Sequence, residues 1–283
     1  MDGWKNIIRI ALTCDVERDS SIKNDLPKVI DIFNEFKAVG TWFIQHDFGK
    51  YYTEHFGRVD EKFPEILEKL SHIGEIGSHV HFRNKKGEFC SDFNFQKQLL
   101  EKATDSLRSK GYNVKSFRGG DHFFNNDTLK VLEELNYEID SSVMQGFSRK
   151  IHGNFLINHK IRKSGLKINE PYFLSKDNYL EPGESNILEI PVTNLAFFLK
   201  KPTFFIPFPI PGNIKIGKIS NLSFLFSKFL GFLKNDILIV FLFHDFNLCG
   251  KNSIYNFRKF IEKCTNDKNT KFVTLKEVKS KHA

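Results

Sequence analysis

The feature that most constrains the fold is a repeated alternation of short apolar, β-branched runs with amphipathic segments of helix length. This alternation occurs at least four times, and it is typical of a parallel α/β fold whose site lies at the carboxyl ends of the strands. Residues 142–185 are less regular and are expected to form loops or short hairpins, and the proline-rich residues 202–212 are expected to be extended. The expected strands are 7–13, 41–44, 75–82, 114–117, 137–141, 187–191, 236–243 and 271–274, and the expected helices are 25–40, 63–73, 94–110, 128–135, 220–233 and 252–264.

The organisation of the chain favours one domain over residues 1–283. The 283 residues contain no internal repeat, linker or low-complexity segment. The four cysteines show neither a CxxC pair nor zinc-finger spacing, and no signal-peptide pattern is found at the start. The longest uncharged stretches, 219–227 and 237–243, are too short to span a bilayer. These features predict a cytoplasmic protein.

The charge and the aromatic content bear on partners. The net charge is +8, but the lysines are scattered, so a solvated surface is favoured and no nucleic-acid partner is expected. Phe is unusually frequent, at 31 residues, and concentrates in 197–208 and 224–232. The favoured interpretation of these stretches is a core face. The alternative is an apolar patch near the site that supports peripheral association with the inner membrane surface.

Four polar residues at the ends of the first and third expected strands indicate a metal site. Asp15 and Glu17 lie two residues apart, so their side chains point to one face, and His79 and His81 repeat this spacing. Two imidazoles and two carboxylates form a donor set suited to Zn²⁺ or another first-row divalent ion. Each residue alone is also consistent with a helix cap or a structural histidine, so the prediction depends on all four together.

Several motifs in chain order resemble those of the polysaccharide deacetylases (carbohydrate esterase family 4). The resemblance covers most of the chain, and it implies a distorted (β/α) barrel that removes N- or O-acyl groups from sugars with a divalent ion. The matching segments are Thr13–Glu17, Gly40–Ile44, Glu75–His79, Ser116–Gly120, Thr128–Ser142, Leu242–His244 and Phe272–Leu275.

The resemblance also implies roles for single residues. Asp15 would be the general base that takes a proton from metal-bound water. Arg118 would orient Asp15 and keep it ionised, and His244 would protonate the leaving amine. The family pattern would be completed by an aspartate that orients His244, but the adjacent Asp245 would point the other way if the strand continued.

The expected ligands depart from the family pattern at two places. Val16 stands where the family has a second aspartate, so Glu17 is the nearest substitute, with Asp15 as the alternative ligand. The family's histidines are four residues apart, whereas His79 is followed two residues later by His81. The residue four after His79 is Arg83, which cannot bind a cation. The expected ligand set is Glu17, His79 and His81, with zinc as the preferred ion.

Other polar residues near strand ends are candidates for lining the pocket or, equally, for ordinary loop positions: His46, Asp47, Asp121 and His122. The remaining histidines are expected on the surface or in packing.

We therefore predict a metal-dependent hydrolase that removes an N-acetyl or N-formyl group from a sugar. A cytoplasmic location favours a nucleotide- or lipid-linked glycan intermediate of surface polysaccharide synthesis as the substrate, because the basic charge suits a diphosphate. The alternatives are a hydrolase of non-sugar linear C–N bonds, and a sugar-binding protein that keeps the fold without catalysis.

Overall fold

The computed structural model describes residues 7–46, 57–84, 86–144, 148–151, 155–158, 170–193 and 236–282. The proline-rich segment 202–212, the expected helix 220–233, both Phe-rich stretches, Asp47, His55, His152 and His159 lie outside these residues. Within the described residues, no helix is both long and apolar enough to cross a membrane.

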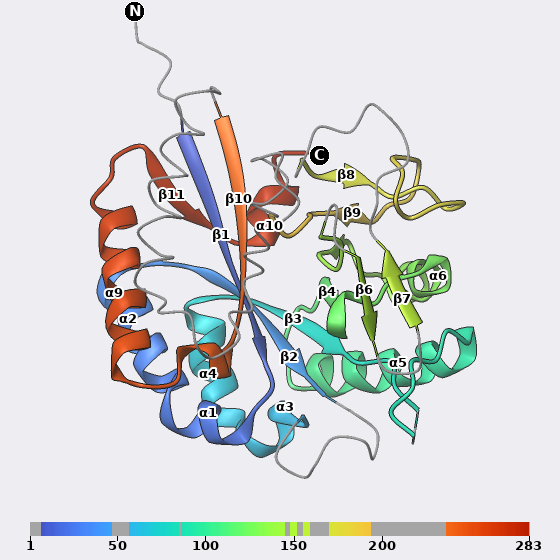
Figure 1. The fold of residues 1–283 in the computed structure, drawn as a ribbon, viewed down its shortest axis with the longest axis horizontal. Coiled ribbons are helices and arrows are strands. Elements are labelled where there is room, and N and C mark those ends of the chain that lie inside the picture. Colours follow the sequence, from blue (N-terminus) through green and yellow to red (C-terminus); the bar gives the residue numbers. More distant parts are fainter. Residues whose placement is uncertain are drawn as a thin grey trace, which may run out of the picture.

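One curled sheet organises the chain (Figure 1). Its order is β10-β1-β2-β3-β4-β5-β9-β8, β11 also pairs with β1, and every pairing is parallel except that between β8 and β9. A separate antiparallel hairpin is formed by β6 and β7. The strands are β1 (Ile7–Val16), β2 (Gly40–Gln45), β3 (Gly74–Val80), β4 (Ser116–Gly119), β5 (Ile139–Asp140), β6 (Ser148–Ile151), β7 (Phe155–Asn158), β8 (Tyr172–Phe173), β9 (Leu188–Glu189), β10 (Asp236–His244) and β11 (Thr270–Val273).

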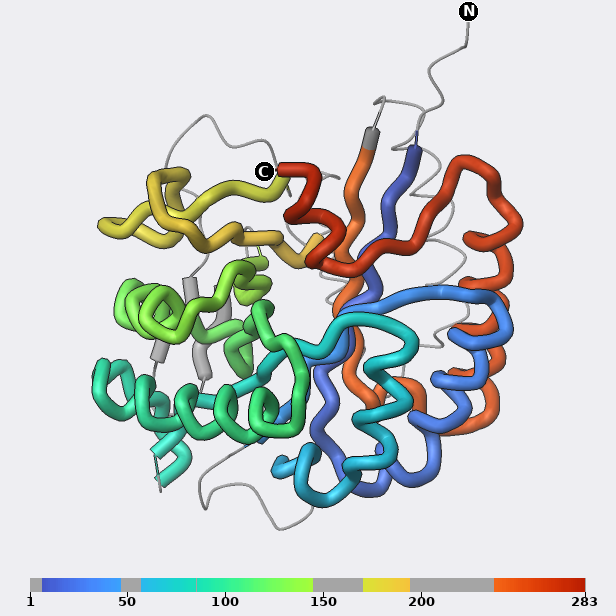
Figure 2. The backbone as a smooth tube through the Cα atoms, turned by 180° about the vertical axis from the view of Figure 1, so that it is seen from behind, coloured from blue at the N-terminus to red at the C-terminus, as the bar shows by residue number. Residues whose placement is uncertain are grey.

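Helices cover the outside of the curled sheet, as Figures 1 and 2 show from opposite sides. Helices α2, α4 and α9 lie beside β1, β2 and β10, whereas α5 and α6 lie beside β3 and β4. The helices are α1 (Asp19–Asn24), α2 (Leu26–Phe36), α3 (Val59–Lys62), α4 (Pro64–His72), α5 (Phe93–Ser109), α6 (Asn126–Glu134), α9 (Lys251–Thr265) and α10 (Leu275–Lys279), and two 3₁₀ turns, η2 (Gly120–His122) and η4 (Asp245–Leu248), follow β4 and β10.

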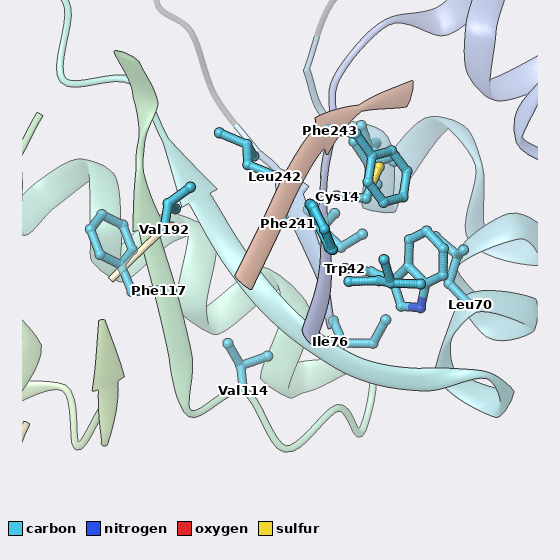
Figure 3. Packing of buried hydrophobic residues seen from close by; sticks show 14 of the residues in the cluster. Cys14, Trp42, Leu70, Ile76, Val114, Phe117, Val192, Phe241, Leu242 and Phe243 are labelled. Atoms are coloured by element: carbon cyan, nitrogen blue, oxygen red, sulfur yellow. The ribbon is translucent and has the colours of Figure 1, made fainter. Parts of the chain in front are cut away.

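The outer face of the sheet carries the larger apolar core. Cys14, Trp42 and Phe243 come from three neighbouring strands and pack together under the helices (Figure 3). The rings of Trp42 and Phe243 meet edge to face with centroids 6.4 Å apart. Because side chains alternate along a strand, these residues leave their neighbours in sequence on the inner face.

The inner face encloses a second apolar cluster, covered by α10 where β2 and β3 begin. Leu275 and Val278 of α10 pack against Ala11, Phe43 and other inner residues. The amide of Leu275 donates to Thr41 Oγ1 at 3.1 Å, which fixes the start of the helix near the amino-terminal end of β2. This end of the enclosed space is therefore filled with side chains.

The curled sheet is brought toward closure where Thr193 meets Val240 of β10. The Thr193 amide donates to the Val240 carbonyl at 3.1 Å, and the Val240 amide donates to Thr193 Oγ1 at 2.9 Å. The chain that follows β9 thus reaches the opposite edge strand. The expected distorted (β/α) barrel is therefore the architecture of the described residues.

Most expected elements are present with small shifts in their bounds. The strand expected at 114–117 lies at Ser116–Gly119, and those expected at 137–141 and 187–191 shorten to pairs of residues. The helices α1 and α10 were not expected, because short helices carry little periodicity.

Candidate metal centre and active site

Register brings the polar residues of four strands to one end of the sheet. Asp15 of β1 lies opposite His244 of β10, and His79 of β3 lies opposite Arg118 of β4. All four belong to the inner face, since residues two apart on a strand share a face and their neighbours Cys14, Phe117 and Phe243 lie in the outer core. The sequence could place these residues at strand ends, and the register places them together.

Glu17, His79 and His81 present three donor atoms to one point. Glu17 Oε1 lies 2.9 Å from His79 Nε2 and 3.3 Å from His81 Nε2. One donor atom from each residue lies within 4.8 Å of the others, and all three side chains are buried. Two imidazole nitrogens and a carboxylate oxygen form the donor set that first-row divalent ions bind.

Each of the two histidines is held by its other ring nitrogen. His79 Nδ1 donates to the carbonyl of Arg118 at 2.9 Å, so Nε2 is the ring nitrogen that faces Glu17. His81 Nδ1 lies 3.1 Å from Asp121 Oδ2. Such outer partners fix the tautomer and orientation of metal-binding histidines. The arrangement therefore suits a cation.

Beside the three donors lies a buried ion pair. Arg118 Nη1 donates to Asp15 Oδ1 at 3.1 Å, and Nε and Nη2 of the guanidinium donate to the carbonyl and hydroxyl of Ser141 at 2.8 and 2.9 Å. The guanidinium also lies over the Phe43 ring, 4.3 Å from its centroid. Arg118 is thereby fixed on two sides, and it holds the Asp15 carboxylate in one orientation.

The charges around the site set its ionisation. Burial alone raises the pKa of Asp15, but the charges of His79 and Arg118 outweigh burial and lower it. Burial also opposes ionisation of Glu17, yet its bonds to His79 and His81 hold its pKa well below the usual range. Both carboxylates are therefore ionised at neutral pH.

The other oxygen of Asp15 faces His244. Asp15 Oδ2 lies 3.8 Å from His244 Nε2 and 4.0 Å from His79 Nε2. Asp15, Glu17 and His244 form a second group whose donor atoms lie within 4.8 Å of one another. A carboxylate and an imidazole at this distance are two groups that can accept and donate protons.

Comparison with known proteins settles the fold. No family model and no curated protein matches the sequence. A structure from Mycobacterium smegmatis, assigned as a polysaccharide deacetylase, matches 99% of this chain and 91% of its own at 17% identity, with a TM-score of 0.67. The fold is that of the polysaccharide deacetylases.

Two further structures with this fold bear on chemistry. An allantoinase matches 98% of this chain and 90% of its own, with a TM-score of 0.62 and 12% identity. A family 4 acetyl xylan esterase from Clostridium thermocellum, in complex with a cobalt ion, matches 96% and 90%, with a TM-score of 0.51 and 12% identity. The fold therefore hosts several reactions, and the site has to distinguish them.

The alternation of side chains along β1 separates Val16 from Glu17. Val16 is fully buried in the outer core, so it cannot reach the inner face. Glu17, one residue further, returns to that face and contacts both histidines.

His244 has no described carboxylate partner at its Nδ1 atom. The carboxylate of Asp245 instead accepts the backbone amides of Glu17 and Arg18, at 3.2 and 3.0 Å. Burial, and next the charge of Glu17, raise the pKa of Asp245. Asp245 thus ties the ends of β1 and β10 together, in agreement with its expected orientation away from His244.

The pocket-lining candidates have separate surroundings. His46 Nδ1 pairs with the buried carboxylate of Asp60 at 3.0 Å, which Lys110 also contacts at 2.5 Å, so His46 belongs to a structural network. His122 Nδ1 donates to the Ser142 carbonyl at 3.0 Å, and burial followed by the charge of Arg118 lowers its pKa to about 4. Of the other histidines, His72 and His282 are exposed.

Sequence reasoning missed Arg83 as a supporting residue. Its Nη2 donates to Asp121 Oδ2 at 2.7 Å, and its guanidinium lies 4.2 Å from the centroid of the Phe89 ring. Arg83 therefore fixes the carboxylate that holds His81.

Gly120 is a second residue whose role was missed. A Cβ atom there would lie 2.2 Å from His81 Cγ, so only glycine lets the ring occupy its place. The signal in the sequence was the Gly119-Gly120 pair directly after a strand.

Proposed function

We propose that the protein is a metal-dependent hydrolase that removes an N-acetyl or N-formyl group from a sugar. The observation that carries this proposal is the convergence of Glu17, His79 and His81 beside the ion-paired Asp15. A site with this donor set, next to a buried and ionised carboxylate, is suited to activating water against an acyl carbon.

The donor set fits a divalent cation. Glu17, His79 and His81 would hold it, and Asp15 is the alternative ligand, since its Oδ2 lies 4.0 Å from His79 Nε2. Zinc is the preferred ion for two imidazoles and a carboxylate, and the cobalt complex of the xylan esterase supports a first-row ion. When bound, such a cation lowers the pKa of a coordinated water and polarises the acyl carbonyl.

The remaining residues would move and hold protons. Asp15 would accept the proton of the attacking water at Oδ2, because Oδ1 is engaged by Arg118. Arg118 would keep Asp15 ionised and oriented throughout. His244, whose Nε2 lies 3.8 Å from Asp15 Oδ2, would donate a proton to the leaving amine.

The substrate class follows from features outside the site. We propose a nucleotide- or lipid-linked sugar intermediate, because the net charge of +8 favours a diphosphate carrier. We also propose a cytoplasmic location, which agrees with the absence of a disulfide among the four cysteines, all within the described residues. Peripheral association with the inner membrane surface remains a proposal from the Phe-rich composition and the basic charge.

Hydrolysis of a C–N bond in a substrate that is not a sugar is the second candidate. The observation that favours it is the match to an allantoinase over nearly the whole length of both chains. The same base, cation and acid would serve this reaction, since both reactions break a C–N bond at a carbonyl carbon.

Elemental analysis and acyl release test the proposal together. Wild-type protein is expected to bind about one divalent ion per chain, and His79→Ala and His81→Ala should lose it, whereas the exposed His72→Ala should keep it. Wild type should release acetate or formate from nucleotide-linked N-acyl sugars, and none of the metal-free variants should. Hydrolysis of allantoin, without release of acetate or formate from any N-acyl sugar, would favour the second candidate. Full metal occupancy in both site variants would overturn the ligand assignment, and sugar binding without any release would indicate a binding protein.

A further inference from the structure

Gln45, the last residue of β2, has a buried amide without a hydrogen-bond partner. Its side chain is fully buried, and neither Oε1 nor Nε2 makes a hydrogen bond. Buried amides are nearly always satisfied, because an unsatisfied buried donor or acceptor destabilises the folded state. A single side chain with both atoms unsatisfied therefore requires an explanation.

The position of Gln45 directs its side chain into the candidate active site. Gln45 lies opposite His79 in the pairing of β2 with β3. Phe43, two residues earlier, points inward, since Arg118 lies over its ring. Side chains two apart share a face, so Gln45 also points inward. The pairing of β1 with β2 ends at Val16 and Ile44, so Gln45 lies just beyond the last paired residues of these two strands.

Trp42 provides a contrast on the same strand. Its indole Nε1 is also buried and without a partner, but Trp42 lies on the outer face among apolar side chains (Figure 3). Gln45, by comparison, belongs to the inner face, where it lies opposite the candidate cation ligand His79.

We propose that Gln45 contacts the substrate's acyl group. Its Nε2 donates a hydrogen bond to the acyl oxygen. This inference rests on the proposed function and adds a residue that orients the acyl group, since the acyl oxygen supplies the acceptor that Nε2 lacks. Binding of the substrate thereby satisfies the Nε2 donor, which is unsatisfied in the free protein.

The test compares Gln45→Met with the matched control Trp42→Phe on the opposite face of β2. The probe is acetate, the product of deacetylation, whose oxygens accept the Nε2 hydrogen bond. Melting temperature, zinc affinity and acetate affinity are measured for each zinc-loaded protein, and the side-chain amide signals of Gln45 are followed by NMR during the acetate titration.

Gln45→Met is expected to melt at or above the wild-type temperature, because an apolar side chain of similar size removes an unsatisfied amide. Zinc affinity should stay within about twofold, while acetate affinity should fall by about tenfold, the loss of one hydrogen bond to a charged group. The Gln45 amide signals should shift with acetate in the wild type. Trp42→Phe should leave zinc and acetate affinity unchanged.

Unchanged acetate affinity in Gln45→Met would overturn the inference, and so would a loss of zinc, which would make Gln45 a cation ligand instead. The inference would also be overturned if the Gln45 side-chain amide signals did not shift during the acetate titration, with or without zinc. Shifted signals in a protein that hydrolyses no N-acyl sugar would refute the proposed function and leave the acyl contact standing.

Discussion

His81 Nδ1 lies 3.1 Å from Asp121 Oδ2, so a ring that faces the candidate cation site is held from behind by a carboxylate. Asp121 adopts a left-handed backbone with φ of 53°, and Arg83 holds its carboxylate in place. Left-handed conformations of residues other than glycine cluster at functional sites. His81 is therefore positioned by a strained turn and two charged side chains.

Replacing Asp121 should weaken cation binding. We expect Asp121→Asn to lower zinc affinity by about 10- to 100-fold, because His81 loses its orientation and part of its basicity. Competition with a chelator of known affinity measures this change. Asp127→Asn is the control. Lys130 donates to the Asp127 carboxylate at 3.1 Å on the exposed side of α6, away from the candidate site. Equal affinities in the Asp121 variant and the wild type would show that His81 needs no outer partner.

Zinc binding should release a proton at neutral pH. Burial lowers the pKa of His81, but hydrogen bonds to Asp121 and Glu17 raise it to about 9 in the cation-free protein. His81 is thus protonated below about pH 9, and a cation has to displace that proton. Zinc affinity should rise with pH up to about 9 and level off above it. Calorimetry at pH 7 in two buffers of different ionisation enthalpy should give about one proton released, and none released would contradict the ligand role of His81.

Replacing Asp15 should separate catalysis from cation binding. Asp15→Asn removes the proposed base, so activity should fall by about 10²- to 10⁴-fold while the cation is retained by Glu17, His79 and His81. The change also leaves the buried charge of Arg118 uncompensated, and we expect a loss of about 3–5 kcal/mol in the free energy of unfolding. Denaturant unfolding and zinc content measure both effects.

The variant Asp19→Asn is the control for the Asp15 experiment. Asp19 pairs with the partly exposed Lys62 at 3.1 Å, and we expect its loss to cost about 1 kcal/mol or less, as for exposed ion pairs. A similar loss of stability in both variants would contradict the importance of the buried ion pair. Full activity of Asp15→Asn would remove Asp15 from the mechanism.

The sequence predicted that the candidate site lies at the carboxyl ends of the strands, because the end of a strand is a local feature of the sequence. Asp15, Glu17, His79 and His81 could be assigned to one end from their own strands alone. Their mutual distances could not, since register depends on packing between segments more than fifty residues apart. The same limit hid the pairing of Asp121, itself a candidate residue, with His81, which is 40 residues away.

Other parts of the fold were hidden for a different reason. The α10 helix at Leu275–Lys279 has five residues, too few for a periodic pattern. It nevertheless covers the inner apolar cluster near the start of β2. Gln45 directly follows the predicted strand 41–44, but an isolated glutamine in a sequence does not reveal that its amide is buried without partners. Whether a side chain is buried, and whether its polar atoms form hydrogen bonds, depends on the packing of the folded chain.

Replacing Gly120 should displace His81 directly. A methyl group at this position would overlap the His81 ring, so Gly120→Ala should lower zinc affinity at least as much as Asp121→Asn. The control is Gly111→Ala, where the left-handed φ of 90° strains alanine but no atom lies within 4 Å. Both variants should lose stability, and only the first should lose zinc affinity. Retention of zinc by Gly120→Ala would mean that the His81 ring does not hold the cation.

A buried carboxyl pair should make stability depend on pH. Asp140 of β5 lies opposite Glu189 of β9, and both side chains are fully buried. Asp140 Oδ1 accepts from Ser142 Oγ at 2.6 Å and Glu189 Oε1 accepts from the Val143 amide at 3.1 Å, which leaves one oxygen of each acid without a partner. Burial raises the pKa of both groups, and the charge of Asp140 raises that of Glu189 further.

The folded protein therefore binds more protons than the unfolded chain above about pH 4.5, the ordinary pKa of a glutamate. Stability contributed by the protonated pair is complete below that pH and is lost as pH rises toward the folded pKa, by up to about 1.4 kcal/mol for each pH unit. Glu189→Gln removes one titrating group and supplies an N–H donor for Asp140. We expect it to match the wild type near pH 4.5 and to melt at increasingly higher temperature than the wild type from pH 5 to 8. The exposed Glu184→Gln should follow the wild type at every pH. A constant difference between Glu189→Gln and wild type across this range would show that the pair does not hold a proton.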